Sequence, residues 1–245
     1  MQKTYQEWIQ LRTRDCDRFG QWKPSAVLEA MQDAAGQHST LLGCGRETLV
    51  EKGIVWVITR CETRFETCPS VLDRVQIETF PMPLRHWLFP RYFIFRDAEG
   101  NRLGAASTFW VLFDLKNRCM LEPGEVARAI PDNSDLTPPI GAPGSPKRLQ
   151  GQEHVSARMP AFCELDVNGH VNNARYADWL LDALGLETLQ EFSVQTLRVN
   201  YASEILPGRQ IALKLVRDGL AFYFTGSHEG KLCFEIGGTL QKRAE

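Results

Sequence analysis

Three polar residues at alternate positions, Asp166, Asn168 and His170, stand just before an amphipathic run. If this segment is extended, their side chains share one face, because side chains alternate along extended backbone with a period of two. A helix N-terminus beside them would supply backbone N–H donors, expected at Asn172 and Asn173, and a partial positive charge. The combination is suited to stabilising the oxyanion of an acyl transfer.

The same segment also fits a purely structural role. Asn172 or Asn173 is a good N-cap for the following helix, and Asp166 can satisfy further N–H groups or the helix dipole. A lone histidine is more often structural than catalytic. Capping alone, however, does not require His170.

A base or a nucleophile is needed to complete such a site. Cys163 is close to His170 in sequence, but nothing else marks it as a thiolate, so a Cys–His pair ranks low. Glu204 is expected at the end of the first strand after the helix, either as an exposed edge charge or as a carboxylate directed at a site. Composition alone favours the exposed edge.

The helix that positions this motif has a counterpart 149 positions earlier. Asp17–Asp33 aligns without a gap on Asp166–Asp182, and both segments place a polar turn before a helical apolar pattern. The motif positions in the first copy hold Asp17, Phe19 and Gln21. Because only the second copy has a histidine, we infer that the second copy works and the first has another task.

Each expected helix carries an apolar stripe. In the first copy the stripe consists of Val27, Ala30, Met31, Ala34, His38 and Leu41, and in the second of Tyr176, Trp179, Leu180, Ala183 and Leu184. Segments rich in Val, Ile, Phe, Trp and Thr follow each helix and predict strands. They are Ile54–Phe65, Val71–Phe80, Trp87–Arg96 and Leu103–Asp114, and then Phe192–Ala202, Arg209–Arg217, Leu220–His228 and Lys231–Gln241.

Each half therefore indicates one long helix followed by an antiparallel meander, an α+β unit whose helix packs across its sheet. The stretch 131–150, rich in Pro and Gly, is expected to be a linker between an N-terminal domain (1–130) and a C-terminal domain (151–245). A single unrepeated α+β domain is the alternative. The linker and the ungapped match favour two copies.

Composition narrows the class of protein. Of 245 residues, 43% are hydrophobic and 24% are charged, and the net charge of −2 argues against a general nucleic-acid binder. No segment approaches the ~18 uninterrupted apolar residues of a membrane span, and the N-terminal residues do not form a secretory signal peptide. The scattered cysteines lack metal-binding spacing, and we expect reduced thiols in a cytoplasmic protein.

The segment Glu164–Leu184 resembles the signature of acyl-ACP thioesterases, with the shared core Asp-x-Asn-x-His-Val-Asn-Asn-x-x-Tyr followed by a Trp. The piece Arg14–Ala35 also looks like the opening of that family's first domain. The resemblance covers nearly the whole chain. It implies two tandem hot-dog domains, each a long central helix wrapped by an antiparallel sheet.

The resemblance also implies a catalytic set of Asp166, Asn168, His170 and Glu204. The last matches the Glu of the family's Tyr-x-x-Glu-Cys, whereas Ile205 replaces the Cys, so a cysteine nucleophile at that position is not available. We therefore expect Glu204, with His170, to activate water for attack on a thioester. Asp166 is expected to orient its neighbours, without a settled division of roles between the two carboxylates.

By the same resemblance, the carbonyl or the water is held by Asn168 and by N–H groups at Asn172 and Asn173. No metal or cofactor is implied. The first domain would hold the acyl tunnel, with some of Met31, Ala34, His38 and Trp56 lining it.

The implied partner is acyl carrier protein (ACP) carrying a fatty acyl chain on phosphopantetheine. Because ACP is acidic, a basic docking surface is expected. Its candidates are Arg12, Arg14, Arg18, Lys23, Arg85, Arg91, Lys147 and Arg148. Competing functions are an acyl-CoA thioesterase or a hydroxyacyl-thioester dehydratase on the same fold, and a non-catalytic acyl-binding protein. A monomer and a homodimer both fit.

Overall fold

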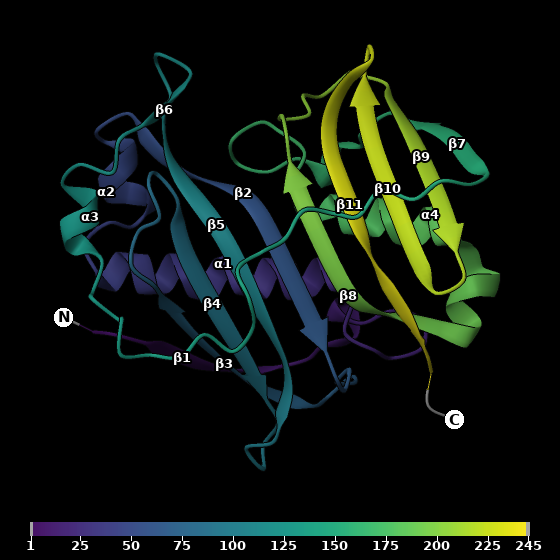
Figure 1. The fold of residues 1–245 in the computed structure, drawn as a ribbon, viewed down its shortest axis with the longest axis horizontal. Helices are drawn as coiled ribbons and strands as arrows, with labels where there is room; N and C mark the ends of the chain where they lie inside the picture. Colours follow the sequence, from purple (N-terminus) through teal and green to yellow (C-terminus); the bar gives the residue numbers. More distant parts are fainter. Residues whose placement is uncertain (1, 244–245) are drawn as a thin grey trace. The chain divides into compact units, whose positions relative to one another are not determined.

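The computed structural model describes residues 2–243. The chain divides into two compact units, the first running to Pro143 and the second beginning at Gly144, with Pro24–Ala26 grouped with the second. Each unit contains an antiparallel sheet and one long helix that crosses one face of it (Figure 1). The α+β class expected from the sequence is confirmed.

The first unit is built from strands β1–β6 and helices α1–α3. Their bounds are β1 Tyr5–Gln10, α1 Pro24–Leu41, α2 Arg46–Val50, β2 Ile54–Phe65, β3 Arg74–Pro81, β4 Phe89–Arg96, β5 Arg102–Asp114, β6 Cys119–Leu121 and α3 Val126–Ala129. The strand order is β1-β3-β4-β5-β2, and β6 pairs with β5.

The second unit repeats this plan. Its elements are β7 Glu153–Arg158, α4 Arg175–Glu191, β8 Phe192–Tyr201, β9 Ile211–Asp218, β10 Ala221–His228 and β11 Lys231–Lys242. The strand order is β7-β9-β10-β11-β8, so in both units the first strand pairs with the third and the second with the fifth. The internal repeat inferred from the sequence therefore extends to the topology of the sheets.

The expected simple meander is wrong in one respect. β3, β4 and β5 do pair in succession, but β2 pairs with β5, and not with β3, which follows it in the chain. The same exchange places β8 beside β11. Each unit also has a strand before its helix, β1 or β7, which pairs with β3 or β9 at the other edge of the sheet. These two short strands were not predicted.

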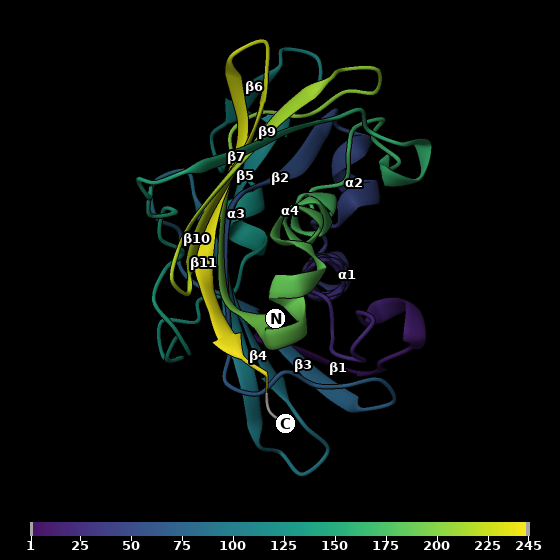
Figure 2. The ribbon, with the colours of Figure 1, turned by 90° about the vertical axis from the view of Figure 1, so that its right-hand side faces the viewer.

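The buried face of each long helix follows the predicted stripe. In α1, Val27, Met31, Ala34 and His38 are buried at the spacing of a helical face, but Leu41, expected on the stripe, is 60% exposed, because α1 ends there. Figure 2 shows α1 and α4 each lying on the inner side of the curve of its own sheet.

Helix α4 buries Tyr176, Trp179, Leu180 and Leu184. It is interrupted at Gly185, which has φ 77° and ψ 162°. Only glycine adopts this backbone conformation without strain, so the glycine fixes the point at which the regular helix stops.

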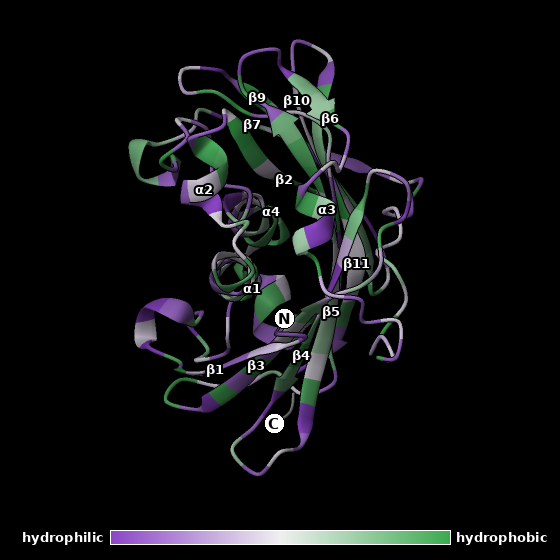
Figure 3. Ribbon diagram, turned by 90° about the vertical axis from the view of Figure 1, so that its left-hand side faces the viewer, coloured by the Kyte–Doolittle hydropathy of each residue, from purple (hydrophilic) through white to green (hydrophobic). Residues whose placement is uncertain are grey.

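Several strands bury alternate residues, as a sheet with one covered face requires, whereas β4 and β5 are buried on both faces over much of their length. β10 shows the alternating pattern, with Phe222 and Phe224 buried and their neighbours partly exposed. Figure 3 shows hydrophobic residues along the strands, whereas the connecting turns are mostly hydrophilic. Each sheet thus presents its apolar face to the helix of its own unit.

Candidate functional site

The polar motif forms a tight turn, so the extended segment assumed from the sequence is wrong. The Asp166 N–H donates to His170 O at 2.8 Å, and the Gly169 N–H donates to Asp166 O at 3.0 Å. The Asp166 carboxylate accepts the Asn168 N–H at 2.8 Å. Asp166 therefore stabilises the turn through its side chain. Asp commonly does this by accepting a hydrogen bond from the backbone N–H two residues later.

The helix begins one or two residues later than expected from an N-cap at Asn173 or Asn172. Its first helical residue is Arg175, and the Asn172 side chain accepts the Ala174 N–H at 2.9 Å. Asn172 thus stabilises the turn that leads into α4, and Ala174, in place of either asparagine, is the N-cap.

His170 and Glu204 are brought together. His170 Nε2 lies 3.0 Å from Glu204 Oε2, and their side chains are 28% and 32% exposed. The residues are 34 positions apart in sequence. Glu204 is therefore a partner of the motif, and not only the edge charge that composition alone favoured.

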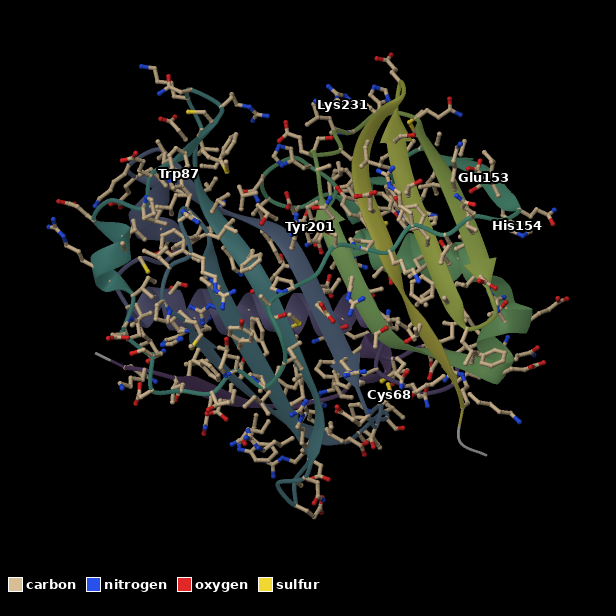
Figure 4. The ribbon with its side chains drawn as sticks, viewed as in Figure 1. Cys68, Trp87, Glu153, His154, Tyr201 and Lys231 are labelled. Atoms are coloured by element: carbon tan, nitrogen blue, oxygen red, sulfur yellow. The ribbon has the colours of Figure 1, made fainter. Side chains whose placement is uncertain are left out.

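Backbone bonds fix this pair. The Val171 N–H donates to Ile205 O at 2.9 Å, which ties the residue after His170 to the residue after Glu204. The turn that carries Glu204 is held to β11, because the Ala202 and Ser203 N–H groups both donate to Cys233 O at 2.9 and 3.0 Å. In Figure 4, Tyr201 is labelled where β8 ends and this turn begins.

Of the two predicted backbone donors, one is already used. The Asn172 N–H donates to Glu164 O at 2.8 Å. The Asn173 N–H makes no hydrogen bond within residues 2–243. The structure therefore leaves the Asn173 N–H as a backbone donor open to a substrate oxygen, whereas the exposed amide of Asn168 donates to Asp166 Oδ2 at 3.4 Å.

The buried hydroxyl of Tyr176 lies under the same turn. Tyr176 is 1% exposed, and its ring stacks on Phe234 at 4.3 Å between centroids. Burial raises the pKa of its phenol, with further contributions from Cys233, Asp166 and Glu204. Tyr176 thus stays protonated and adds no charge beside the pair.

Glu164 holds the start of the motif to helix α4, a role that the sequence did not predict. Its side chain, 8% exposed, pairs with Arg158 and accepts the Trp179 Nε1–H at 2.8 Å and the Ala161 N–H at 2.7 Å. Burial disfavours its charge, but these donors outweigh that penalty and lower the pKa of Glu164. A buried carboxylate thus connects the start of the turn to the middle of α4.

The first copy keeps the backbone of this turn without its chemistry. The Asp17 N–H donates to Gln21 O at 2.8 Å, and the Lys23 N–H donates to Asp15 O at 2.9 Å, as the Asp166 and Asn172 N–H groups do in the second copy. The Asp15 carboxylate takes the role of Glu164 by accepting the Arg12 N–H at 2.8 Å.

In the first copy, the Trp22 N–H donates to Pro69 O at 2.9 Å, the counterpart of the bond from Val171 to Ile205. Cys68 therefore occupies the position of Glu204, in the turn after β2 (Figure 4). The first copy has a glutamine and a cysteine where the second has the His–Glu pair, which explains why only one copy is equipped for acid–base chemistry.

The residues expected at an acyl tunnel lie in the interior of the first unit. Met31, Ala34 and His38 are fully buried along one face of α1, and the half-buried Trp56 donates from Nε1 to Cys44 O at 2.9 Å. One docking candidate is wrong: Arg91 is 5% exposed, because its side chain points from β4 to His38 on the helix side of the sheet. Of the other candidates, Lys23 is half-buried and the rest are exposed.

Within residues 2–243, no group of three or more His, Cys, Asp or Glu side chains is placed to hold a metal ion. No helix in this part of the chain has the length and apolar character needed to cross a membrane.

Comparison with known proteins identifies the family to which this sequence is similar. The model of the acyl-ACP thioesterase N-terminal domain matches residues 2–127, and that of the C-terminal domain matches residues 148–235. The palmitoyl-acyl carrier protein thioesterase of Gossypium hirsutum is 28% identical over 73% of this chain and 46% of its own length. The dodecanoyl-[acyl-carrier-protein] hydrolase of Cinnamomum camphora is 24% identical over 86% of this chain and 57% of its own.

The chain thus spans about half the length of the curated relatives it matches. Among solved structures, an acyl-ACP thioesterase from Bacteroides thetaiotaomicron has a TM-score of 0.87 at 21% identity, covering 97% of this chain and 98% of that one. That similarity shows the fold, and the two matched domain models cover most of the sequence. The chain belongs to the acyl-ACP thioesterase family.

Proposed function

We propose that this protein hydrolyses the thioester of fatty acyl-ACP and so releases a free fatty acid. The observation that carries the proposal is the pair formed by His170 and Glu204, 3.0 Å apart. The pair sits in a turn with the family's signature, and two backbone connections and a buried carboxylate fix its geometry. Membership in the family supports the substrate class.

The reaction begins with a water molecule that attacks the thioester carbonyl carbon. Glu204 accepts the proton of this water, and His170 shares that proton through its contact with the carboxylate. Asp166 has a different task, because its Oδ1 accepts backbone N–H groups of the turn and its Oδ2 accepts the Asn168 side-chain amide. The geometry therefore supports Glu204 as the base and Asp166 as the residue that shapes the turn.

The tetrahedral intermediate carries its negative charge on the former carbonyl oxygen. The Asn173 N–H is the backbone donor that remains for this oxyanion, and the nearby start of α4 adds a favourable dipole. When the C–S bond breaks, the phosphopantetheine thiolate takes the proton from the His170–Glu204 pair. The fatty acid and the thiol of ACP are the products.

The first unit, whose matching turn lacks the pair, receives the acyl chain in this proposal. Its long helix presents Met31, Ala34 and His38 to the interior of the unit, which supports an apolar binding role. The exposed arginines Arg12, Arg14 and Arg18 remain candidates for docking ACP. A cytoplasmic location stays a prediction.

The test compares acyl chains from octanoyl to oleoyl attached to ACP or to CoA, and follows release of the free thiol. We expect turnover of the ACP esters at higher kcat/KM than that of the CoA esters. Faster turnover of the CoA esters, or reversible hydration of an enoyl thioester, would favour another activity on this fold. The absence of thiol release from every thioester would refute hydrolysis.

A further inference from the structure

The interior of the first unit contains a charged side chain that the proposed reaction does not use. Arg91 on β4 is 5% exposed and belongs to a row of buried aromatic residues that includes Phe89, Phe93 and Phe95. A guanidinium remains protonated at neutral pH even here, where burial lowers the pKa of Arg91 to about 10. A buried positive charge normally has an anionic partner.

Arg91 has neutral partners. Its NH1 group donates to His38 Nδ1 at 3.1 Å and to Thr79 Oγ1 at 3.2 Å. Thr79 in turn donates its hydroxyl proton to Tyr92 O at 2.9 Å, which leaves its lone pairs for Arg91. Within residues 2–243, Arg91 forms no ion pair with a carboxylate.

His38 cannot supply the missing charge. Its Nε2 lies 3.1 Å from Gln2 O and donates to it, so Nδ1 is the lone-pair nitrogen that faces Arg91. Burial, and next the charge of Arg91, lower the pKa of His38 to about 4, so the imidazole is neutral. Cys44, also near Arg91, is a buried thiol whose pKa is raised by burial.

A guanidinium has five N–H donors in a fork that fits a carboxylate. The Nε–H and the second amino group of Arg91 have no acceptor within the described residues. These donors belong to the guanidinium that bonds His38, the polar last member of the buried stripe that also contains Met31 and Ala34. From Met31 to His38 the helix rises about 10 Å.

We propose that Arg91 is a specificity residue that recognises an oxygen-bearing distal end, preferably a carboxylate, on the acyl chain. The inference rests on the proposed function, since that function brings an acyl chain into the first unit. A methyl end that reached Arg91 would leave the remaining N–H donors of Arg91 without an acceptor. A carboxylate would accept charge-assisted hydrogen bonds from these donors.

The experiment measures binding, so that it does not depend on catalysis. Acyl-pantetheine amides, in which an amide replaces the thioester, are prepared with 8, 10, 12 and 14 carbons and with methyl, carboxyl or carboxyl methyl-ester ends. Calorimetry on the full chain gives their Kd values. At the length that reaches Arg91, we expect the carboxyl-ended chain to bind at least about tenfold more tightly than the methyl-ended chain. The methyl ester should lose this advantage.

The Arg91→Met variant should lose the preference, and Arg91→Lys should retain part of it. Arg96→Met is the matched control, because Arg96 lies on the same strand but pairs with Glu78 at 2.8 Å. Equal binding of the carboxyl and methyl ends to the wild type at every length would overturn the proposal, even if Arg91→Met failed to fold. A preference that persisted in a folded Arg91→Met protein would also overturn it. Failure of the proposed hydrolysis would appear separately, as no turnover of any thioester.

Discussion

Replacing Glu164 by glutamine should destabilise the second unit, because Glu164 is the buried anchor of the turn that carries His170. The substitution keeps the shape of the side chain but removes its negative charge. That charge accepts hydrogen bonds from Trp179 Nε1–H at 2.8 Å and from the Ala161 N–H at 2.7 Å. Hydrogen bonds to a charged group contribute about 1.5–3 kcal/mol each, and one amide oxygen can replace only part of them. We discount Arg158, whose side chain is 33% exposed. The expected loss is about 2 kcal/mol in the free energy of unfolding at pH 7.

The pH dependence provides an internal check on this loss. Because the folded pKa of Glu164 is lowered, its carboxylate stabilises the fold fully above the unfolded value, about 4.3. That stabilisation disappears as the pH falls through the folded pKa. Urea unfolding followed by circular dichroism should therefore show wild type and Glu164→Gln converging in strongly acidic solution.

Asp182→Asn is the matched control for the anchor. Asp182 also bonds Arg158, at 3.0 Å, but its side chain is 66% exposed, so its loss should cost less than about 0.5 kcal/mol. If Glu164→Gln were no less stable than Asp182→Asn at pH 7, the buried carboxylate would not be the anchor we describe.

Two further predictions concern the helices and the buried histidine. Gly185→Ala should destabilise the protein by about 1 kcal/mol, because Gly185 has φ +77°. Gly36→Ala should instead stabilise it by up to about 1 kcal/mol, because Gly36 lies inside α1 with open space at its Cβ. Thermal unfolding that gave both variants a stability change of the same sign would contradict this. Because the folded pKa of His38 is lowered to about 4, stability should fall by at most about 3 kcal/mol as the pH decreases from 6.5 to 4. His38→Gln should flatten this slope in urea titrations and His154→Gln, at an exposed position, should not; equal slopes in all three proteins would refute the assignment.

The long helices and eight of the strands could be predicted because their periodicity directly reflects burial. Ile54–Phe65 was predicted with the bounds of β2, and the other seven strands were within three residues at each end. β1, β6 and β7 were missed, since short strands of three or six residues bury too little to show a clear pattern. In β7 only Arg158 is even partly buried, so the hydrophobic signal is weak there.

The sequence could point to the residues of the candidate site but not to their geometry. The repeat between Asp17 and Asp166 and the family's motif identified His170 and Glu204, but no sequence pattern gave the distance between them. Glu164 was detectable in principle, because its counterpart Asp15 is also acidic. The alignment of Asp17 with Asp166 needed extension by only two residues toward the N-terminus. Arg91 could not be placed, since one arginine in a strand does not show which face it occupies.

The role of Glu204 as general base is tested most directly by the rate at which Glu204→Gln releases fatty acid from acyl-ACP, with an intact fold verified by circular dichroism. The wild type should turn over acyl-ACP, and the variant should have a kcat at least about 10²-fold lower, the usual contribution of a general base. Glu187→Gln, on the exposed side of α4, should match the wild type. A folded Glu204→Gln protein that hydrolyses acyl-ACP within a few-fold of the wild-type rate would contradict the central claim.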